Sequence, residues 1–440
     1  MFLFGTQTIK PNGHLEIGGC DAVDLAREYG TPLYVMDEQA IRDRMRDYVQ
    51  SFNALYPTTI AYAGKAFLTT AMARIVEQEG LDLDVASGGE LYTALAADFP
   101  AERIVFHGNN KSDDEIAMGL DRSVGRFVLD NLFELERLDR MATERAVEAR
   151  VMIRCTPGID PHTHRLIRTG QEDTKFGLSI KSGDAMEAAR RIVASSGLRL
   201  VGFHSHLGSN LMDATSHIEA VDVMARFVAE AQRELGITIE QLDMGGGLGV
   251  RYLPEHKPMS VAQFAERVVG SLTEALERYG AGRPRLELEP GRSIVAEAGV
   301  TLYSVGAVKE VSIPEAPGRR IYVDIDGGMS DNPRPQLYEA RYHAYLANRA
   351  NEEADTTVTI AGKHCETDIL IWNVEMPRPE PGDILAVPST GAYNHAMASN
   401  YNRLTRPAAV LVQDGQADLI VRRETLDDLI RQDVVPERLR

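Results

Sequence analysis

A lysine follows a short apolar run early in the chain. In the segment "TIAYAGKAF", residues 59–67, Lys65 stands where a predicted buried strand ends. An amine held out of water loses its proton readily and forms Schiff bases with carbonyl groups, including the aldehyde of pyridoxal phosphate. A lysine at a strand end also commonly extends its ammonium group into solvent. Lys65 by itself therefore leaves a covalent role and a solvated role both open.

A glycine-rich turn offers a possible phosphate site. The segment "DMGGGLG" contains Gly245, Gly246 and Gly247, whose backbone N–H groups no side chain covers, which suits a phosphate oxygen. The same glycines are typical of a simple tight turn. The spacing is not that of a dinucleotide-binding fingerprint, because Val250 stands where that pattern requires glycine. A nicotinamide cofactor is therefore disfavoured.

A carboxylate and an arginine follow the last strand of this series. The segment "ELEPGR" places Glu289 and Arg292 at a strand end. A carboxylate beside a pyridine nitrogen keeps that nitrogen protonated, and the ring can then take up an electron pair. A surface ion pair is the other interpretation of this segment.

Two histidines share one face of another predicted strand. In "FHSHLGSN", His204 and His206 are two residues apart, the spacing of a zinc-binding pair at the mouth of a barrel, as in amidohydrolases. The segment fits equally well a His206 stacked on a cofactor ring with Ser209 at a phosphate, or a structural histidine. The residues alone leave the three possibilities open.

These residues lie at the ends of eight short apolar runs, most of them followed by a stretch with helical periodicity. The runs are "IAYAGK", "LDVAS", "RIVFHGN", "RFVLDN", "VMIRCTPG", "VGFHSHLGS", "LDMGGG" and "LELEPGR". Eight strand-then-helix units predict an α/β fold with a TIM (β/α)8 barrel, whose active site lies at the carboxyl ends of the strands. The predicted basin contains Lys65, Asp84, Ser87, His107, Asn109, His204, His206, Ser209, Gly245 to Gly247, Glu289 and Arg292.

Strands without long intervening helices follow the barrel segment. Runs such as "TLYSVGAVKEV", "RIYVDIDGG" and "DILIWNV" predict a second, mostly antiparallel β domain. The N-terminal "TIKPNGHLEIGG" has a turn between two short strand candidates and can join that domain. We therefore expect a barrel domain over residues 38–295 and a β-rich domain formed by residues 1–37 and 296–440.

The amino-acid composition limits which partners the protein can bind. The 440 residues include 65 acidic and 47 basic ones, a formal charge of −18 that repels nucleic acid and anionic membranes. The opening "MFLFGTQTIK" is too short for a signal-peptide core, so a cytoplasmic protein without membrane or nucleic-acid partners is expected. The three cysteines, Cys20, Cys155 and Cys365, are too few and scattered for a disulfide framework or a four-thiolate metal site.

Ten segments, in order along nearly the whole chain, resemble one enzyme family. They include "GTPLYVMD", "YAGKAF", "LDVASGGELYTAL", "HTHRLIRTGQEDTKFG", "DMGGGLG", "EPGRSIVAEAG", "RPQLY", "CETD" and "GAYNHAMASNYN". On these motifs the chain is identified as a member of the fold-type III pyridoxal-phosphate decarboxylases. Within that family it is most similar to the enzymes that act on diaminopimelate.

The resemblance implies roles for individual residues. Lys65 matches the lysine that holds the cofactor covalently, and Glu289 the carboxylate that faces the pyridine nitrogen. His206 matches the histidine stacked on the cofactor ring, and the phosphate is matched by Ser209, Gly245, Gly246, Gly247 and Arg292. Arg292, Arg334 and Tyr338 match residues that bind the substrate, and Tyr393 matches one that contacts both cofactor and substrate. Cys365 and Glu366 match residues contributed by the neighbouring subunit, the thiol as proton donor and the carboxylate as binder of the substrate's distal amino group.

The implied activity is decarboxylation of meso-2,6-diaminopimelate to L-lysine by a cytoplasmic homodimer with shared active sites, without a metal. The segment "CETDIL" is one residue shorter than the common Cys-Glu-Ser-Gly-Asp form, and it lies in the loop that carries substrate specificity. The alternatives are a sister decarboxylase of ornithine, arginine or carboxynorspermidine, and, from another class, a zinc amidohydrolase. A non-catalytic relative is a third, against which Lys65, Glu289 and Cys365 argue together.

Overall fold

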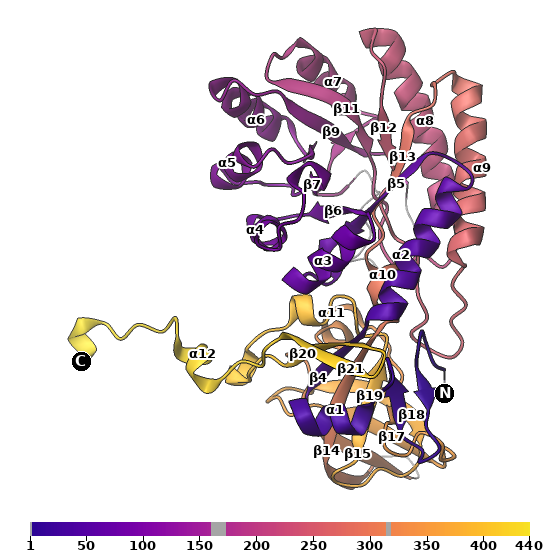
Figure 1. Ribbon diagram of the computed structural model, residues 1–440, viewed down its shortest axis with the longest axis vertical. Coiled ribbons are helices and arrows are strands. Elements are labelled where there is room, and N and C mark those ends of the chain that lie inside the picture. The colour runs from indigo at the N-terminus through magenta and orange to yellow at the C-terminus, as the bar shows by residue number, and fades with distance from the viewer. Residues whose placement is uncertain (1, 160–172, 314–317) are drawn as a thin grey trace. The chain divides into compact units, whose positions relative to one another are not determined.

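The computed structural model describes residues 2–159, 173–313 and 318–440 (Figure 1). The chain forms two compact units. The barrel unit comprises Arg42–Val250 and Lys257–Ile294, and the β-rich unit comprises Met1–Ile41, Arg251–His256 and Val295–Arg440. Residues 160–172, which include most of the motif "HTHRLIRTGQEDTKFG", lie outside the described residues.

Eight parallel strands close into the predicted barrel. Each pairs with its neighbour, and β9 also pairs with β8, which completes the ring. In ring order the strands are β5 (Thr58–Ala63), β6 (Asp82–Val85), β7 (Ile104–Phe106), β8 (Arg126–Leu129), β9 (Ala149–Thr156), β11 (Leu198–His204), β12 (Gln241–Asp243) and β13 (Arg285–Leu288). All eight apolar runs recognised in the sequence are barrel strands, so the prediction of a TIM barrel is confirmed. A short strand, β10 (Leu178–Ser179), pairs in parallel with the carboxyl end of β9.

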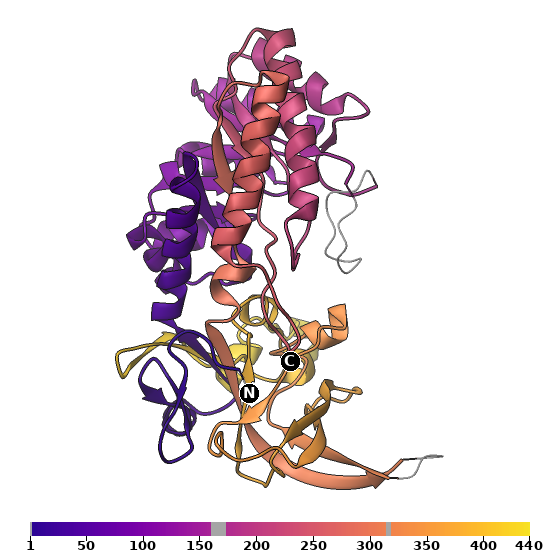
Figure 2. The same ribbon diagram turned by 90° about the vertical axis from the view of Figure 1, so that its right-hand side faces the viewer.

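Helices surround the barrel strands in the upper part of Figure 1. The helices in sequence order are α2 (Glu38–Asn53), α3 (Thr70–Gln78), α4 (Gly88–Ala96), α5 (Asp113–Asp121), α6 (Leu132–Glu144), α7 (Asp184–Ala194), α8 (Thr215–Leu235), α9 (Val261–Tyr279) and α10 (Arg292–Val295). The two longest, α8 and α9, run side by side (Figure 2).

Helix α9 shows how the sequence determines where a helix starts, which face it buries and where it ends. Ser260 caps its first turn, because its hydroxyl accepts the N–H of Gln263 while the Gln263 side chain accepts the N–H of Ser260. Buried apolar residues recur at three- and four-residue spacing, among them Phe264, Val268 and Leu272. The helix ends at Gly280, whose left-handed backbone (φ 66°) a residue without Cβ adopts at little cost.

Apolar side chains and one ion network fill the barrel interior. Ala61, Val105, Val128, Met152 and Val201 form a buried cluster contributed by five strands. In addition, the guanidinium of Arg126 on β8 links two other strands, because it donates to Asp82 of β6 at 2.8 Å and to Glu287 of β13 at 2.5 Å. Asp82 and Arg126 are the first residues of their strands, so this network lies toward the end opposite the predicted basin. Its buried charges are therefore matched without involving the strand ends.

The β-rich unit is built on a mostly antiparallel sheet of nine strands. Two pairings, β15 with β17 and β20 with β4, are parallel. The sheet contains β4 (Leu33–Asp37), β14 (Gly299–Ser312), β15 (Arg319–Ile325), β16 (Tyr345–Leu346), β17 (Thr356–Ala361), β18 (Ile369–Met376), β19 (Ile384–Pro388), β20 (Ala408–Gln413) and β21 (Gln416–Val421). The prediction of a second, mostly antiparallel β structure is thus confirmed.

Short elements complete the β-rich unit. A small sheet of β1 (Thr8–Ile9), β2 (Leu15–Ile17) and β3 (Cys20–Asp21) precedes α1 (Ala22–Tyr29), and α11 (Arg334–Tyr338) and α12 (Leu426–Ile430) are single-turn helices. Apolar residues of β2, α1, β4, β14 and β20 pack into one buried core. Across the described parts of both units, none of the helices is long and apolar enough to cross a membrane.

Candidate active site at the carboxyl ends of the barrel strands

Lys65 stands at the end of β5 with a countercharge beside it. The strand ends at Ala63, and Lys65 lies in a single turn of 3-10 helix, Gly64–Ala66. Its Nζ donates to Asp84 Oδ2 at 3.4 Å, and Asp84, on the neighbouring strand β6, is 1% exposed. Because 43% of the Lys65 side-chain surface is exposed to solvent, its amine is accessible to a ligand at the carboxyl ends of the strands. Lys65 therefore offers an amine that a carbonyl ligand can reach, and the buried Asp84 balances the charge of its ammonium form.

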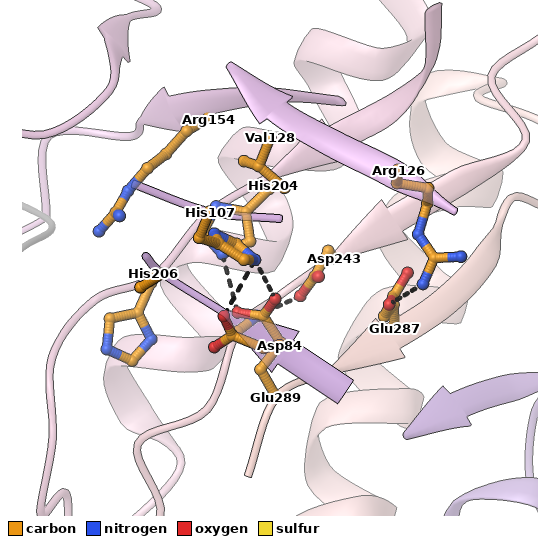
Figure 3. Close-up of polar contacts among 12 residues, drawn as sticks. Asp84, His107, Arg126, Val128, Arg154, His204, His206, Asp243, Glu287 and Glu289 are labelled. Carbon is orange, nitrogen blue, oxygen red and sulfur yellow. Dashed lines mark hydrogen bonds and ion pairs between the residues drawn. The ribbon is translucent and has the colours of Figure 1, made fainter. Parts of the chain in front are cut away.

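Glu289 lies two residues beyond Glu287 and accepts hydrogen bonds from two histidines (Figure 3). His107 Nε2, just after β7, is 2.5 Å from its Oε1, and His204 Nε2, at the end of β11, is 3.1 Å from its Oε2. Burial by itself raises the pKa of Glu289, but the two histidines outweigh it and hold that pKa well below its usual range. Glu289 is therefore an ionised carboxylate inside the barrel, 4% exposed.

The His204 imidazole acts as a neutral donor. Burial lowers the pKa of His204 to about 4, so near pH 7 its ring carries a single proton and can give it to Glu289. The rings of His107 and His204 meet edge to face, with centroids 4.8 Å apart. This arrangement orients both Nε2 atoms toward one carboxylate.

The same three residues could be considered as a metal centre, since their ligand atoms lie within 4.8 Å of one another. However, both imidazole Nε2 atoms already contact the carboxylate oxygens directly. The sequence raised His204 and His206 as the metal-binding pair, but the structure groups His204 with His107 instead. A hydrogen-bonded carboxylate describes this geometry better than a zinc site.

His206 follows β11 and lies beside the glycine turn. Its Nδ1 accepts the N–H of Gly246 at 3.3 Å, and its ring lies to one side of Glu289 in Figure 3. Burial, followed by the positive charge of Lys65, lowers the pKa of His206 well below its usual range. A neutral, partly buried imidazole near Lys65 has the properties needed to stack on an uncharged face of an aromatic ring.

The glycine turn leaves no room for side chains. A Cβ on Gly245 would lie 2.7 Å from His206 Nδ1, one on Gly246 would collide with the Glu289 carbonyl oxygen, and one on Gly247 would lie 2.6 Å from the Gly208 carbonyl oxygen. Gly245 and Gly247 also have positive φ angles, 65° and 121°, which side chains disfavour. The backbone of this turn is thus held close to His206 and Glu289.

Ser209 and Arg292 face each other in the same region. The Nε of Arg292 donates to Ser209 Oγ at 2.9 Å, and Arg292 is 4% exposed. Hence the guanidinium, a hydroxyl and the glycine turn all belong to the carboxyl end of the barrel, as an anion-binding group would require.

Two residues of the predicted basin make hydrogen bonds within the barrel unit itself. Ser87 caps α4, because its Oγ accepts the N–H of Glu90 at 3.2 Å, and the Asn109 carbonyl oxygen accepts the side-chain amide of Asn131. Conversely, two residues of the site were missed by the sequence analysis. Arg154 lies two residues before the end of β9, and Asp243 is the last residue of β12. Both lie beside the histidines in Figure 3. The signal for both was available, since each is a charged residue within an apolar run.

In the β-rich unit, three residues assigned to the substrate lie together. The Arg334 guanidinium lies 5.3 Å from the ring centre of Tyr338 and 5.7 Å from that of Tyr393. Its Nε also donates to the Tyr342 hydroxyl at 3.0 Å. Arg334 is 6% exposed, and the tyrosine rings around it hold its guanidinium in one orientation.

Cys365 and Glu366 lie on a surface loop held by a second loop. Cys365 is exposed, and its backbone N–H donates to Asn402 Oδ1 at 3.0 Å. The Tyr401 hydroxyl donates to Glu366 Oε1 at 2.6 Å. Next to them His364 Nδ1 lies 2.5 Å from the buried Asp368. The thiol and the carboxylate are therefore presented to solvent on an anchored loop.

Comparisons with known proteins identify the family. Residues 38–296 match the family described as pyridoxal-dependent decarboxylase, pyridoxal binding domain. Diaminopimelate decarboxylase of Bacillus subtilis (strain 168) is 46% identical over 99% of this chain and 98% of its own length.

Solved structures agree with the sequence relatives. Diaminopimelate decarboxylase from M. jannaschii in co-complex with L-lysine has a TM-score of 0.91 and 37% identity over the full length of both chains. The Helicobacter pylori enzyme complexed with L-lysine has a TM-score of 0.84 and 31% identity, covering 93% of this chain and 98% of that one. The chain therefore belongs to the pyridoxal-dependent decarboxylases, and among them to the diaminopimelate decarboxylase family.

Proposed function

We propose that this protein uses pyridoxal 5'-phosphate to decarboxylate meso-2,6-diaminopimelate to L-lysine and carbon dioxide, the last step of lysine biosynthesis. The observation that carries the proposal is that one barrel end holds both an accessible lysine amine and a buried, ionised carboxylate. The relatives named for this reaction, two of them solved with L-lysine, support the assignment.

The residues present fit pyridoxal phosphate. An aldehyde needs an amine, which Lys65 offers, and a pyridinium nitrogen needs an anionic partner, which Glu289 offers in ionised form. A phosphate needs hydrogen-bond donors and a cation, and Ser209 and Arg292 offer these beside the Gly245–Gly247 turn, whose backbone carries no side chains. The neutral ring of His206 suits stacking between these ends.

Once bound, the cofactor supplies an aldehyde for the substrate amine and a ring that accepts the electron pair left by carbon dioxide. The chain supplies the rest. Lys65 anchors the cofactor and, when released, is a basic amine close to the reacting carbon. Glu289, kept ionised by His107 and His204, keeps a proton on the pyridine nitrogen. Asp84 balances the charge of the Lys65 ammonium group.

We assign substrate recognition to the β-rich unit. Arg334, held by Tyr338 and Tyr393, would bind a substrate carboxylate, while Glu366, oriented by Tyr401, would bind the distal amino group. Arg292 and Tyr393 would contact both cofactor and substrate. Because Cys365 and Glu366 are displayed on an exposed loop, we propose a homodimer in which each copy completes the other's site.

The cellular setting and the boundaries follow from the same proposal. Residues 38–295 would act as the cofactor-binding domain, with residues 1–37 and 296–440 as the β-rich domain. The strongly acidic chain would work in the cytoplasm on a small amino acid.

We expect Cys365→Ala to keep the cofactor but turn over about 10²-fold more slowly. The thiol is proposed to return a proton to the carbon that lost its carboxylate, and loss of a general acid typically costs this much or more. Carbon dioxide release at saturating substrate measures the change, and visible absorbance verifies cofactor loading. Cys20→Ala, a buried thiol of the same unit, is the matched control and should turn over normally. Wild-type turnover in Cys365→Ala would mean that another group is the acid.

The substrate is tested by product analysis on a panel. Purified protein with pyridoxal phosphate is given meso-diaminopimelate, L-ornithine, L-arginine or carboxynorspermidine, and carbon dioxide and amine products are measured. We expect rapid lysine formation from diaminopimelate and at least about 10²-fold lower kcat/KM for the others, since Glu366 and Arg334 would select both ends of the substrate. A preference for ornithine or arginine would make the protein a sister decarboxylase. Activity that requires zinc and no pyridoxal would refute the proposal.

A further inference from the structure

Asp243 joins two parts of the site. It is the last residue of β12 and has no exposed surface. Its Oδ1 accepts the N–H of Gly245 at 2.7 Å, in the glycine turn. Its carboxyl group also makes a side-chain hydrogen bond with Glu289, drawn as a dashed line in Figure 3. Within the described residues, Oδ2 has no N–H or O–H donor.

Two carboxyl groups can form a hydrogen bond only when one of them carries a proton. Glu289 already accepts from His107 and His204, and these two bonds favour its ionised form. Asp243 accepts one backbone N–H, through the oxygen that does not need the proton. The proton therefore belongs on Oδ2 of Asp243, the buried oxygen for which no other donor is available.

The charges around Asp243 agree with this placement. Glu287 of β13 lies beside Asp243 in strand register, and Glu289 follows it two residues later. Burial first, and then the negative charges of Glu289 and Glu287, raise the pKa of Asp243 well above its usual range. Burial lowers the pKa of Arg154 on β9, and Asp243 is one of several acidic residues that oppose this lowering, while the charge of Glu287 is matched by Arg126. An ionised Asp243 would put a third anion among Glu287 and Glu289.

We propose that Asp243 is a positioning residue that stays protonated and donates to Glu289 while its second oxygen holds Gly245. One neutral side chain then sets the orientation of the carboxylate that faces the pyridine nitrogen and of the turn that receives the phosphate. The proposal extends the proposed function, because it concerns the same cofactor site. Asp243 itself need not touch the cofactor.

Infrared spectroscopy with 13C-carboxyl aspartate tests the protonation without substrate or cofactor. We expect the wild-type protein at pH 8 to show the C=O stretch of a protonated aspartic acid, and we expect Asp243→Asn to lack it. Asp331, another buried aspartate, has its pKa raised to about 7 by burial, so Asp331→Asn serves as the control that keeps the Asp243 band. If the wild-type band is absent, or if it survives in Asp243→Asn, the proposal is overturned. Should Asp243→Asn fail to fold, Asp331→Asn is measured at pH 8, and the absence of a protonated-aspartate band there overturns the proposal.

Cofactor affinity tests the positioning role. An amide at position 243 can donate to Glu289 and accept from Gly245, whereas alanine removes both of these hydrogen bonds. We expect the pyridoxal phosphate Kd of Asp243→Asn to stay within about threefold of wild type, and that of folded Asp243→Ala to rise at least about tenfold. Equal losses in both variants would overturn the proposal. A wild-type protein that binds no pyridoxal phosphate would refute the proposed function instead, and the infrared result would still stand.

Discussion

Lys65→Ala should abolish the visible absorbance of bound cofactor and lower kcat by at least about 10³-fold. The Lys65 amine is the proposed covalent anchor of the cofactor and a base beside the reacting carbon, and loss of a covalent catalytic group commonly costs this much. Lys65 lies at the end of β5, 3.4 Å from a buried aspartate, and its side chain is accessible to a ligand. Absorbance spectra and carbon dioxide release from meso-diaminopimelate measure the two effects.

Two control variants separate chemistry from charge. Lys65→Arg keeps a positive charge near Asp84 but provides no amine that can form an imine, so it should be as inactive as Lys65→Ala. Lys257→Ala removes an exposed lysine elsewhere in the barrel unit and should behave as wild type. Full turnover in Lys65→Ala would remove the covalent-cofactor account.

Glu289→Gln should lower kcat by roughly 10²-fold or more at saturating cofactor. An amide carries no charge to keep a proton on the pyridine nitrogen, so the ring becomes a weaker acceptor of electrons. The substitution also removes the ionised acceptor shared by His107 and His204, so cofactor affinity should fall as well. Steady-state kinetics with a cofactor titration separates the two effects.

Glu287→Gln is the matched control, two residues earlier in the chain, on β13. Glu287 is equally buried but pairs with Arg126, so its loss should lower the melting temperature and leave kcat within about threefold. If Glu289→Gln turned over like wild type, the carboxylate would not be the partner of the ring nitrogen.

The sequence was sufficient to predict the barrel because a parallel strand buried on both faces forms a short apolar run that ends in polar or glycine residues. Since all carboxyl ends of the strands meet at one end of a barrel, residues as distant as Lys65 and Asp84 were expected in one basin, and they are paired there. The parallel pairings of β15 with β17 and of β20 with β4 were not foreseen, because apolar alternation does not encode which strands become neighbours.

The partners of individual polar groups could not be predicted in the same way. The bond from His107 to Glu289 joins residues 182 positions apart, and its existence depends on the stagger of the strands. That contact and the one from His204 show that His204 binds a carboxylate, while the stacking role of His206 stays a prediction. Asp243 is visible in the sequence as a charged residue in an apolar run, but its contact with Glu289, far along the chain, could not be predicted. In the β-rich unit, the support that Tyr401 gives to Glu366 depends likewise on two loops meeting.

Trapping the cofactor on the chain is the most direct test of the account. The purified protein is loaded with pyridoxal phosphate, reduced with borohydride, digested and analysed by mass spectrometry. The account predicts one phosphopyridoxyl adduct, on Lys65 in the peptide containing "YAGKAF". No adduct, or an adduct confined to another lysine, would contradict it.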